Sequence, residues 1–277
     1  MKFLCEWDGW VAKQLPLYPR AFTMVGKRRI ENVRDLLVAA IENNIPGDFL
    51  EAGVWRGGCS IFAKAVLAAY GEQNREVYVC DSFQGLPRAS SMMDYDGWEV
   101  SDVLSVSLEA VRANFRVAGF LDNKVHFVKG FFNDSLPSLS RKKFRIAVLR
   151  ADVDMYESTM DILFNLYSKL SVGGFLIIDD WGIPVARKAV RHFFHIHGIS
   201  KYQVEAVDSF AAYIVKDEEL VVDNKWYGKF CARRAVSQTY RTKKNTPLQT
   251  NAKCGGFPFA SCPAEFSFQF VEEVSNY

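Results

Sequence analysis

The sequence has no apolar stretch near the roughly 20 residues that a membrane-spanning helix needs. Its six cysteines form neither a C-x-x-C pair nor a zinc-ligand spacing, and we interpret Cys59 and Cys80 as buried thiols of a reducing compartment. The net charge of +2 gives no general reason to expect nucleic acid or a membrane as a partner. The first residues interrupt their apolar run with Glu6 and Asp8, so we expect no signal peptide. These absences predict a cytoplasmic protein.

Acidic residues are missing from 225–253, a segment with eight Lys or Arg. We interpret it as a solvated, partly disordered tail rather than as an arm for an anionic partner. Beyond about Ala235 the apolar periodicity fails, and no internal repeat is visible. The sequence therefore predicts an N-terminal segment at 1–22, a core domain at 23–235 and a C-terminal extension at 236–277, which we expect to be dispensable for the core.

Short apolar runs alternate with segments of helical periodicity through most of the core. The runs predict strands at residues 49–52, 77–80, 125–128, 146–151 and 175–178. The periodic segments predict helices at residues 27–44, 60–70, 107–118, 158–170 and 185–197. This alternation is typical of an α/β fold, a mostly parallel sheet with helices on both faces. The runs at 202–207 and 210–215 are separated only by Asp208 and Ser209, which predicts a hairpin and an antiparallel terminal strand.

The stretch GDFLEAGVWRGGCSIF, residues 47–62, is the Gly-rich turn between the first predicted strand and the next helix. Its glycines do not have the dinucleotide spacing G-x-G-x-x-G, which disfavours a nicotinamide dehydrogenase. Gly53 allows a close approach of backbone to a ligand, and Gly57 and Gly58 open a helix with free N–H groups. Asp81, at the end of the second strand, is suited to accept hydrogen bonds from ribose hydroxyls. The turn and Asp81 together predict a ligand site.

Four carboxylates follow the fourth and fifth predicted strands: Asp152 and Asp154 in RADVD, and Asp179 and Asp180 in IIDDW. Asp152 and Asp154 share a face in extended geometry. Helix capping explains one or two such acids, but four at neighbouring strand ends repel one another unless a cation lies among them. A cation site made of carboxylate oxygens suits a hard divalent ion, and we therefore expect Mg²⁺.

At these residues the chain resembles the macrocin O-methyltransferase family, enzymes that use S-adenosylmethionine and Mg²⁺ to methylate sugar hydroxyls of antibiotics. The likeness covers residues 23–199 and includes TMVGKRRIENV, GDFLEAGVWRGGCSIF, DSFQGLP, VSLEAVRANF, KGFFNDSLP, AVLRADVDMYESTMD, LYSKLSVGGFLIIDDWG and ARKAV. The resemblance implies a class I methyltransferase fold, which is Rossmann-like. It also implies a small-molecule hydroxyl acceptor, glycosidic in nature, no nucleic-acid or membrane partner, and leaves a homodimer open.

The resemblance also assigns roles to individual residues. Asp152, Asp179 and Asp180 would ligate Mg²⁺, and Asp154 would be the general base. The residues implied around S-adenosylmethionine are Thr23, Met24, Glu51, Ala52, Gly53, Val54, Trp55, Asp81, Ser82, Gly130, Phe131 and Phe132. The segment 88–102, which is long, polar and aromatic, would be a lid over the acceptor.

Three features depart from the family pattern. Val153 stands where the family usually has Gly in the metal motif, the segment before Thr23 is shorter, and the extension after about Ala235 has no recognised counterpart. Rival bases are the four histidines, at positions 126, 192, 195 and 197, for which we favour structural or surface roles. Two other functions stay open from the residues: a Mg²⁺-dependent phosphatase of the haloacid dehalogenase type, and a cofactor-binding protein that has lost catalysis.

Overall fold

The computed structural model describes residues 21–89, 94 and 102–243. The elements in chain order are α1 (Lys27–Glu42), β1 (Asp48–Ala52), α2 (Gly58–Ala69), β2 (Val77–Asp81), η4 (Asp102–Leu104), α3 (Leu108–Val117), β3 (Val125–Lys129), α4 (Phe132–Ser140), β4 (Ile146–Ala151), α5 (Tyr156–Leu166), η5 (Tyr167–Lys169), β5 (Leu170–Ile178), α6 (Pro184–Ile196), β6 (Glu205–Ala206), β7 (Ala212–Val215) and α7 (Asn224–Lys243).

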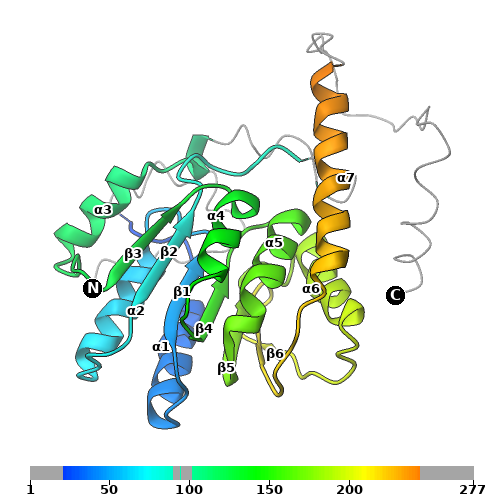
Figure 1. Cartoon of the computed structure of the whole chain (residues 1–277). Helices are drawn as coiled ribbons and strands as arrows, with labels where there is room; N and C mark the ends of the chain where they lie inside the picture. Colours follow the sequence, from blue (N-terminus) through cyan, green and yellow to red (C-terminus); the bar gives the residue numbers. More distant parts are fainter. Residues whose placement is uncertain (1–20, 90–93, 95–101, 244–277) are drawn as a thin grey trace.

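A seven-stranded sheet in the order β3-β2-β1-β4-β5-β7-β6 forms the centre of the molecule (Figure 1). Strands β1 to β5 pair in parallel, and β7 joins β5 antiparallel. The α/β fold class expected from the alternating pattern is therefore confirmed.

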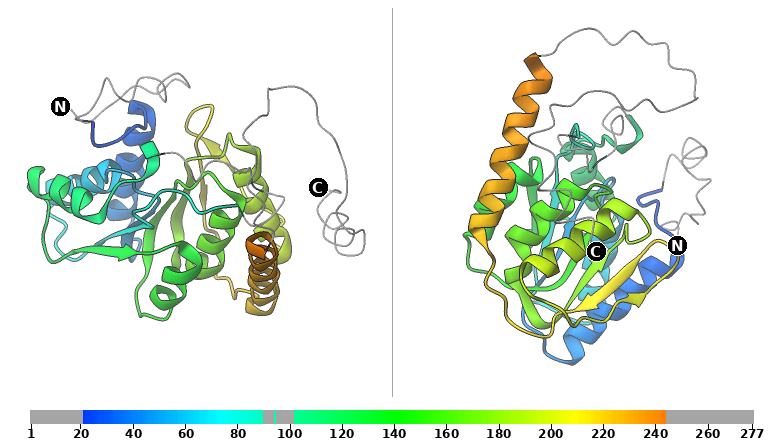
Figure 2. Two further views of the ribbon diagram at one scale, coloured as in Figure 1. Left: turned by 90° about the horizontal axis from the view of Figure 1, so that it is seen from above. Right: turned by 90° about the vertical axis from the view of Figure 1, so that its right-hand side faces the viewer.

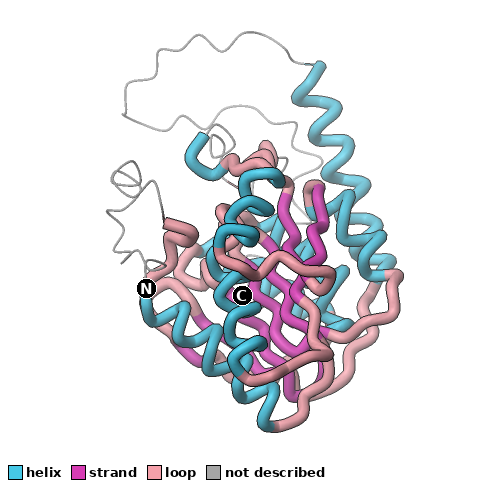
Figure 3. Tube along the Cα trace, turned by 90° about the vertical axis from the view of Figure 1, so that its left-hand side faces the viewer, coloured by secondary structure: helices cyan, strands magenta, loops and turns pink. Residues whose placement is uncertain are grey.

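Helices cover both faces of this sheet, as Figures 2 and 3 show, and a hydrophobic cluster lies under the helices of each face. One contains the inner faces of α1, α2 and α3, with Leu37, Ile61 and Phe115 almost completely buried. The other contains α4, α5 and α6, and Phe230 of α7 joins it. Strand β4 is buried along its whole length. A strand that is buried in this way needs apolar side chains on both faces, and it therefore appears in the sequence as a nearly continuous apolar run.

Three details differ from the expectation. Helix α4 was not expected, since its nine residues include Pro137 and carry few apolar positions. The hairpin is present, but its strands are shorter and its turn is longer, because Asp208 accepts the N–H groups of Phe210 and Ala211 and folds the chain there. Residues 224–243 form the helix α7, so the predicted domain boundary near Ala235 falls inside a helix. Residues 244–277 of the predicted extension lie outside the described residues.

The carboxyl ends of the parallel strands are aligned by hydrogen bonds just beyond them. Gly53 N–H donates to the Cys80 carbonyl at 2.9 Å, Asp152 N–H to the Ala52 carbonyl at 2.9 Å, and Asp179 N–H to the Ala151 carbonyl at 2.9 Å. The residues that follow β1, β4 and β5 therefore meet at one edge of the sheet, where ligands of open α/β folds bind. None of the helices in the described part combines the length and apolar character that crossing a membrane requires.

Gly53 is required at this edge by the protein's own packing. Its φ is +84°, and a Cβ there would lie 1.7 Å from the Asp152 carbonyl oxygen. Since any side chain would separate β1 from β4, glycine is needed for the two strand ends to adjoin. The sequence had suggested approach to a ligand as the reason; Gly53 does line the pocket described next, but the contact with Asp152 is the tighter constraint.

Candidate active site

A pocket opens at the carboxyl ends of the strands. Its lining comes from the turns after β1, β2 and β4, from α4 and α5, and from one residue of α7. The lining residues are Met24, Gly53, Trp55, Asp81, Ser82, Gly85, Leu86, Pro87, Arg88, Leu104, Phe131, Phe132, Asn133, Asp152, Val153, Asp154, Glu157, Ser158, Asp161 and Arg234.

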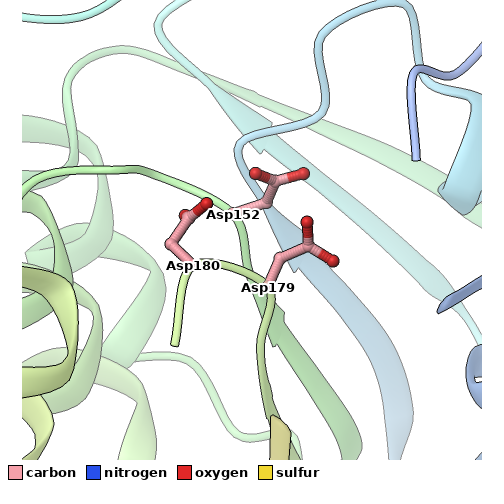
Figure 4. A group of neighbouring side chains, drawn as sticks. All are labelled: Asp152, Asp179 and Asp180. Atoms are coloured by element: carbon pink, nitrogen blue, oxygen red, sulfur yellow. The ribbon is translucent and has the colours of Figure 1, made fainter. Parts of the chain in front are cut away.

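Three carboxylates gather beside this pocket, and Asp152 is part of its lining. Asp152 follows β4, while Asp179 and Asp180 follow β5, and one oxygen of each lies within 4.8 Å of the others (Figure 4). Asp152 is half-buried, and the other two are buried. The structure thus brings together the three residues that the resemblance implied as ligands of one ion.

Arg150 lies directly beneath these carboxylates. It is 1% exposed, and its Nη1 lies 2.5 Å from Glu51 Oε1 and 2.9 Å from Asp152 Oδ2. Its Nη2 lies 2.6 Å from Asp179 Oδ1. Burial lowers the pKa of Arg150, but the surrounding carboxylates, Asp179 first, outweigh burial and raise it above its ordinary value. Arg150 therefore stays charged and partly neutralises the acids.

Arg29 of α1 continues this ion-pair network on the other side of Asp179. Its Nη1 donates to Asp179 Oδ2 at 2.6 Å, and its Nε donates to Asp208 Oδ2 at 2.7 Å. Asp179 therefore contacts an arginine with each of its oxygens. The network fixes its carboxylate between α1 and β4, and it also ties the hairpin turn at Asp208 to the site.

Asp180 shapes the turn that carries Asp154. Its Oδ2 accepts the N–H groups of Val153 at 2.7 Å and of Asp154 at 2.8 Å. Asp154 has a φ of 58°, in the left-handed region that Asp and Asn tolerate better than most residues. Val153, by contrast, is not among the residues with positive φ in the described part of the chain, and its side chain is buried in the core. Valine therefore fits where the family usually has glycine, without backbone strain.

Repulsion among the acids is evident in their pKa values. Burial first, and then the Asp179 carboxylate, raise the pKa of Asp152 well above its ordinary value. Burial and then Asp154 do the same for Asp180, and burial and then Asp152 raise the pKa of Asp154 to about 7. Two arginines do not balance this set of acids. A divalent cation would relieve the repulsion, and the grouped oxygen donors are those that Mg²⁺ prefers, so the residues present fit the ion.

Another part of the lining comes from the turns after β1 and β2 and from the start of α4. Asp81 Oδ2 accepts Val54 N–H at 2.8 Å, and its Oδ1 accepts Phe83 N–H at 2.7 Å, so the carboxylate joins the turns after β1 and β2. The Trp55 N–H and the Ser82 hydroxyl also lie against this carboxylate, and Asp81 is part of the pocket lining.

The residues implied around the cofactor fall into two groups. Those that line the pocket are Met24, Gly53, Trp55, Asp81, Ser82, Phe131 and Phe132. Those outside the lining are Thr23, Glu51, Ala52, Val54 and Gly130. Glu51 in particular is 1% exposed and accepts hydrogen bonds from Ser60 and Arg150, beneath the pocket floor.

The comparison with family models establishes the family of this chain. Residues 8–216 match the model of the macrocin O-methyltransferase family. The chain belongs to this family.

Relatives of known name agree with the assignment to these O-methyltransferases. The 8-demethyl-8-(2,3-dimethoxy-alpha-L-rhamnosyl)-tetracenomycin-C 4'-O-methyltransferase of Streptomyces olivaceus is 46% identical over 185 residues, which cover 65% of this chain and 70% of that protein. The mycinamicin III 3''-O-methyltransferase of Micromonospora griseorubida is 43% identical over 196 residues, covering 68% of this chain and 76% of that protein.

Solved structures show the same fold. The O-methyltransferase NovP superposes with a TM-score of 0.67 at 39% identity, over 72% of this chain and 84% of that one. The calicheamicin methyltransferase CalS11, at a TM-score of 0.56 and 19% identity, shares the fold over 74% of this chain and 84% of that one. The chain therefore has the class I methyltransferase fold. The phosphatase alternative is set aside, because the match to the O-methyltransferase family covers residues 8–216 and so includes Asp152 and Asp154.

Histidines play no part in the pocket lining among the described residues of the methyltransferase. His192 Nδ1 lies 2.5 Å from the Tyr156 hydroxyl, and burial lowers its pKa to about 4. His126 Nε2 lies 2.9 Å from Glu76 Oε2, and His197 contacts the Phe193 carbonyl with Nδ1 at 2.7 Å. These contacts support the structural roles that the sequence favoured.

The sequence interpretation missed several residues that shape the methyltransferase site. Arg150 had a signal, since an arginine inside the apolar run IAVLRA needs a buried partner. Glu157 and Asp161 lie four positions apart on α5, and this spacing could have shown that they share one helix face. Arg29 and Arg234 had no such signal, because their partners lie 150 and 73 positions away along the chain.

Proposed function

We propose that this O-methyltransferase transfers the methyl group of S-adenosylmethionine to a hydroxyl of a sugar attached to a small molecule. The observation that carries the proposal is the pocket itself, whose lining combines the Gly53 turn and Asp81 with the acids Asp152 and Asp154. The family assignment supports it, as does the name of the Streptomyces olivaceus relative, which specifies a rhamnosyl-bearing compound. An acceptor of this kind needs neither nucleic acid nor membrane.

The cofactor would lie over β1 and β2. The Asp81 carboxylate would accept hydrogen bonds from its ribose, and Phe131 and Phe132, which open α4, would flank its adenine. Met24 and Trp55 would enclose the remainder. The support for this placement is that each of these side chains lines the pocket.

Mg²⁺ would be held by Asp152, Asp179 and Asp180. When bound, it would lower the pKa of the acceptor hydroxyl, whose ordinary value near that of water, about 15.7, makes it a poor nucleophile. Arg150 and Arg29 would hold Asp179 in place for this purpose. Their positive charges would also reduce the repulsion among the carboxylates.

Asp154 would accept the proton of the acceptor hydroxyl. Asp154 lines the pocket, and burial raises the pKa of its carboxyl group above the ordinary value, which makes it a stronger base than an exposed carboxylate. As the oxygen–carbon bond forms, the sulfur–carbon bond breaks and its electron pair stays on sulfur, which gives S-adenosylhomocysteine as the product. The proton ends on Asp154. The protein's main contribution would be to align the hydroxyl with the methyl group and to exclude water.

The buried thiols of Cys59 and Cys80 support a cytoplasmic location for this reaction, since both are free and burial raises their pKa above the ordinary value. A homodimer stays a prediction, which light scattering of the purified protein would measure.

The test separates cofactor from metal. Calorimetry should detect S-adenosylhomocysteine binding, and MgCl₂ should raise the melting temperature of the wild type because ligands stabilise the state they bind. The variant Asp152→Asn should lose the response to Mg²⁺, whereas Asp134→Asn, an exposed aspartate on α4, should keep it.

Three results would contradict parts of this proposal. Absence of S-adenosylhomocysteine binding would contradict the assignment of S-adenosylmethionine as the methyl donor. An unchanged Mg²⁺ response in Asp152→Asn would remove the metal site alone. Cofactor binding without methyl transfer to any of a panel of methyl glycosides would favour the non-catalytic alternative.

A further inference from the structure

Helix α7 contributes to the pocket although it lies outside the part of the chain that matches the family model. The match ends at residue 216, and α7 spans Asn224–Lys243. Figure 1 shows this helix at the right of the molecule, rising above the sheet beside α5 and α6. Its residue Arg234 lines the same pocket as Asp154. The pocket wall therefore includes a segment that the family pattern does not describe.

Aromatic stacking fixes α7 against α5. The ring of Phe164 lies 5.3 Å from that of Trp226 at an interplanar angle of 4°, and 4.9 Å from that of Tyr227 at 12°. Phe230 stacks on Trp226 at 5.6 Å and is 7% exposed. Because this contact is extensive and apolar, the first two turns of α7 are held in place, and the position of the next turn follows from them.

Arg234 lies one turn beyond Phe230 and faces the acids of α5. Its Nη1 lies 2.8 Å from Asp161 Oδ2 and 4.0 Å from Glu157 Oε2, and its side chain is 9% exposed. The Tyr227 hydroxyl donates to the other oxygen of Asp161 at 2.7 Å. Asp161 is therefore satisfied on both oxygens, and it anchors the guanidinium through Nη1.

The guanidinium has donors beyond the one that Asp161 uses. Hydrogen bonds among the described residues engage only its Nη1, while a guanidinium carries five N–H groups in a planar fork. Burial opposes the charge on Arg234, but Asp161 and then Glu157 raise its pKa, so it stays cationic. A buried cation with unused donors at a pocket wall is suited to bind oxygen atoms of a ligand.

We propose that Arg234 binds the acceptor and helps to determine its specificity. Its unused N–H groups donate to adjacent oxygen atoms, hydroxyl or ring ether, of a neutral glycoside. A neutral acceptor is favoured because the lining has five acidic residues but only two arginines, Arg88 and Arg234, an excess of negative charge that repels anions. This inference rests on the proposed methyl transfer to a sugar hydroxyl.

The experiment compares Arg234→Met and Arg234→Lys with Arg233→Met, a matched variant of the adjacent, exposed arginine. The probe is methyl α-L-rhamnopyranoside, titrated by ligand-observed NMR in the presence of S-adenosylhomocysteine and MgCl₂. We expect Arg234→Met to weaken probe binding roughly 10- to 100-fold, the range for lost hydrogen bonds to a charged group. Arg234→Lys should fall between Arg234→Met and the wild type, and Arg233→Met should equal the wild type.

S-adenosylhomocysteine affinity, measured by calorimetry, should change less than twofold in all variants, since its predicted contacts, Asp81, Phe131 and Phe132 among them, do not include Arg234. A double variant, Arg234→Gln with Asp161→Asn, distinguishes binding from simple charge balance. If Arg234 only neutralises Asp161, the double variant regains probe affinity, which would overturn the inference. Unchanged probe affinity in Arg234→Met would also overturn it. A wild type that binds the cofactor but not the probe would instead refute the sugar acceptor, and with it this role of Arg234.

Discussion

Asp154 combines two properties that belong to a single residue, a left-handed backbone and a pKa near neutrality. Its φ is 58°, and its carboxyl group has a pKa of about 7. Asparagine tolerates the same backbone region, so Asp154→Asn removes the proton acceptor with little strain. Alanine at this position would add backbone strain to the chemical change.

We therefore predict that Asp154→Asn keeps S-adenosylhomocysteine and Mg²⁺ affinity nearly intact. Turnover should fall by about 10²–10⁴-fold, the usual range for the loss of a general base. Calorimetry for both ligands and single-turnover kinetics on a methyl glycoside with free hydroxyl groups measure the two effects. Weaker Mg²⁺ binding as the main effect, or near-normal turnover, would move the base to another residue.

The N-terminus of α5 shows how one element depends on a distant residue. Asp94 accepts the N–H groups of Tyr156 at 2.5 Å and of Glu157 at 3.0 Å, and thus caps the helix that carries Glu157 and Asp161. Removal of such a cap costs about 1 kcal/mol. Burial first raises the pKa of Asp94 to about 6, and the Glu157 carboxylate adds to this.

The sign of the resulting pH dependence follows from the two states. The unfolded carboxyl group loses its proton near its ordinary pKa of 3.8, while the folded one keeps it up to about pH 6. The contribution of Asp94 to stability is therefore fully present below about pH 4 and is lost as the pH rises through 6. We predict that Asp94→Asn, which cannot titrate, gains stability relative to the wild type across this interval. Urea unfolding at several pH values measures the difference, and parallel curves would refute the assignment.

The stability of the whole molecule depends on whether α7 is part of the core. The predicted boundary near Ala235 would leave Trp226, Tyr227 and Phe230 in the domain, and these are the residues stacked on α5. Truncation after Lys243 should therefore leave the melting temperature unchanged.

Truncation after Asp223 should instead expose Phe164 and lower the free energy of unfolding on the order of 3 kcal/mol, as expected for losing the burial of one or two large side chains. Thermal unfolding and S-adenosylhomocysteine calorimetry on both truncations check this. Equal stability of the two truncated chains would show that α7 contributes nothing to the fold.

The sequence by itself determined the strand–helix alternation, the parallel sheet and the acids at its carboxyl edge. These follow from local patterns, because apolar runs and helical periodicity involve neighbours a few positions apart. The same local patterns predict Asp152, Asp179 and Asp180 at the ends of adjoining strands. It also gave the Gly53 turn, although not the reason for the glycine.

Only the tertiary structure decided which charges meet. Arg29 reaches Asp179 across 150 positions, and Arg234 reaches Asp161 across 73, distances over which no sequence period operates. The register of β1 with β4 sets Glu51 against Arg150, a partner that the sequence did not indicate, and its place beside the cofactor stays a prediction. Helix α7 had a basic, acid-free sequence typical of a solvated tail, and it is a helix packed on the core because Phe164 offers its first turns an aromatic surface. Such pairings arise from the path of the whole chain, which brings together residues that no local pattern relates.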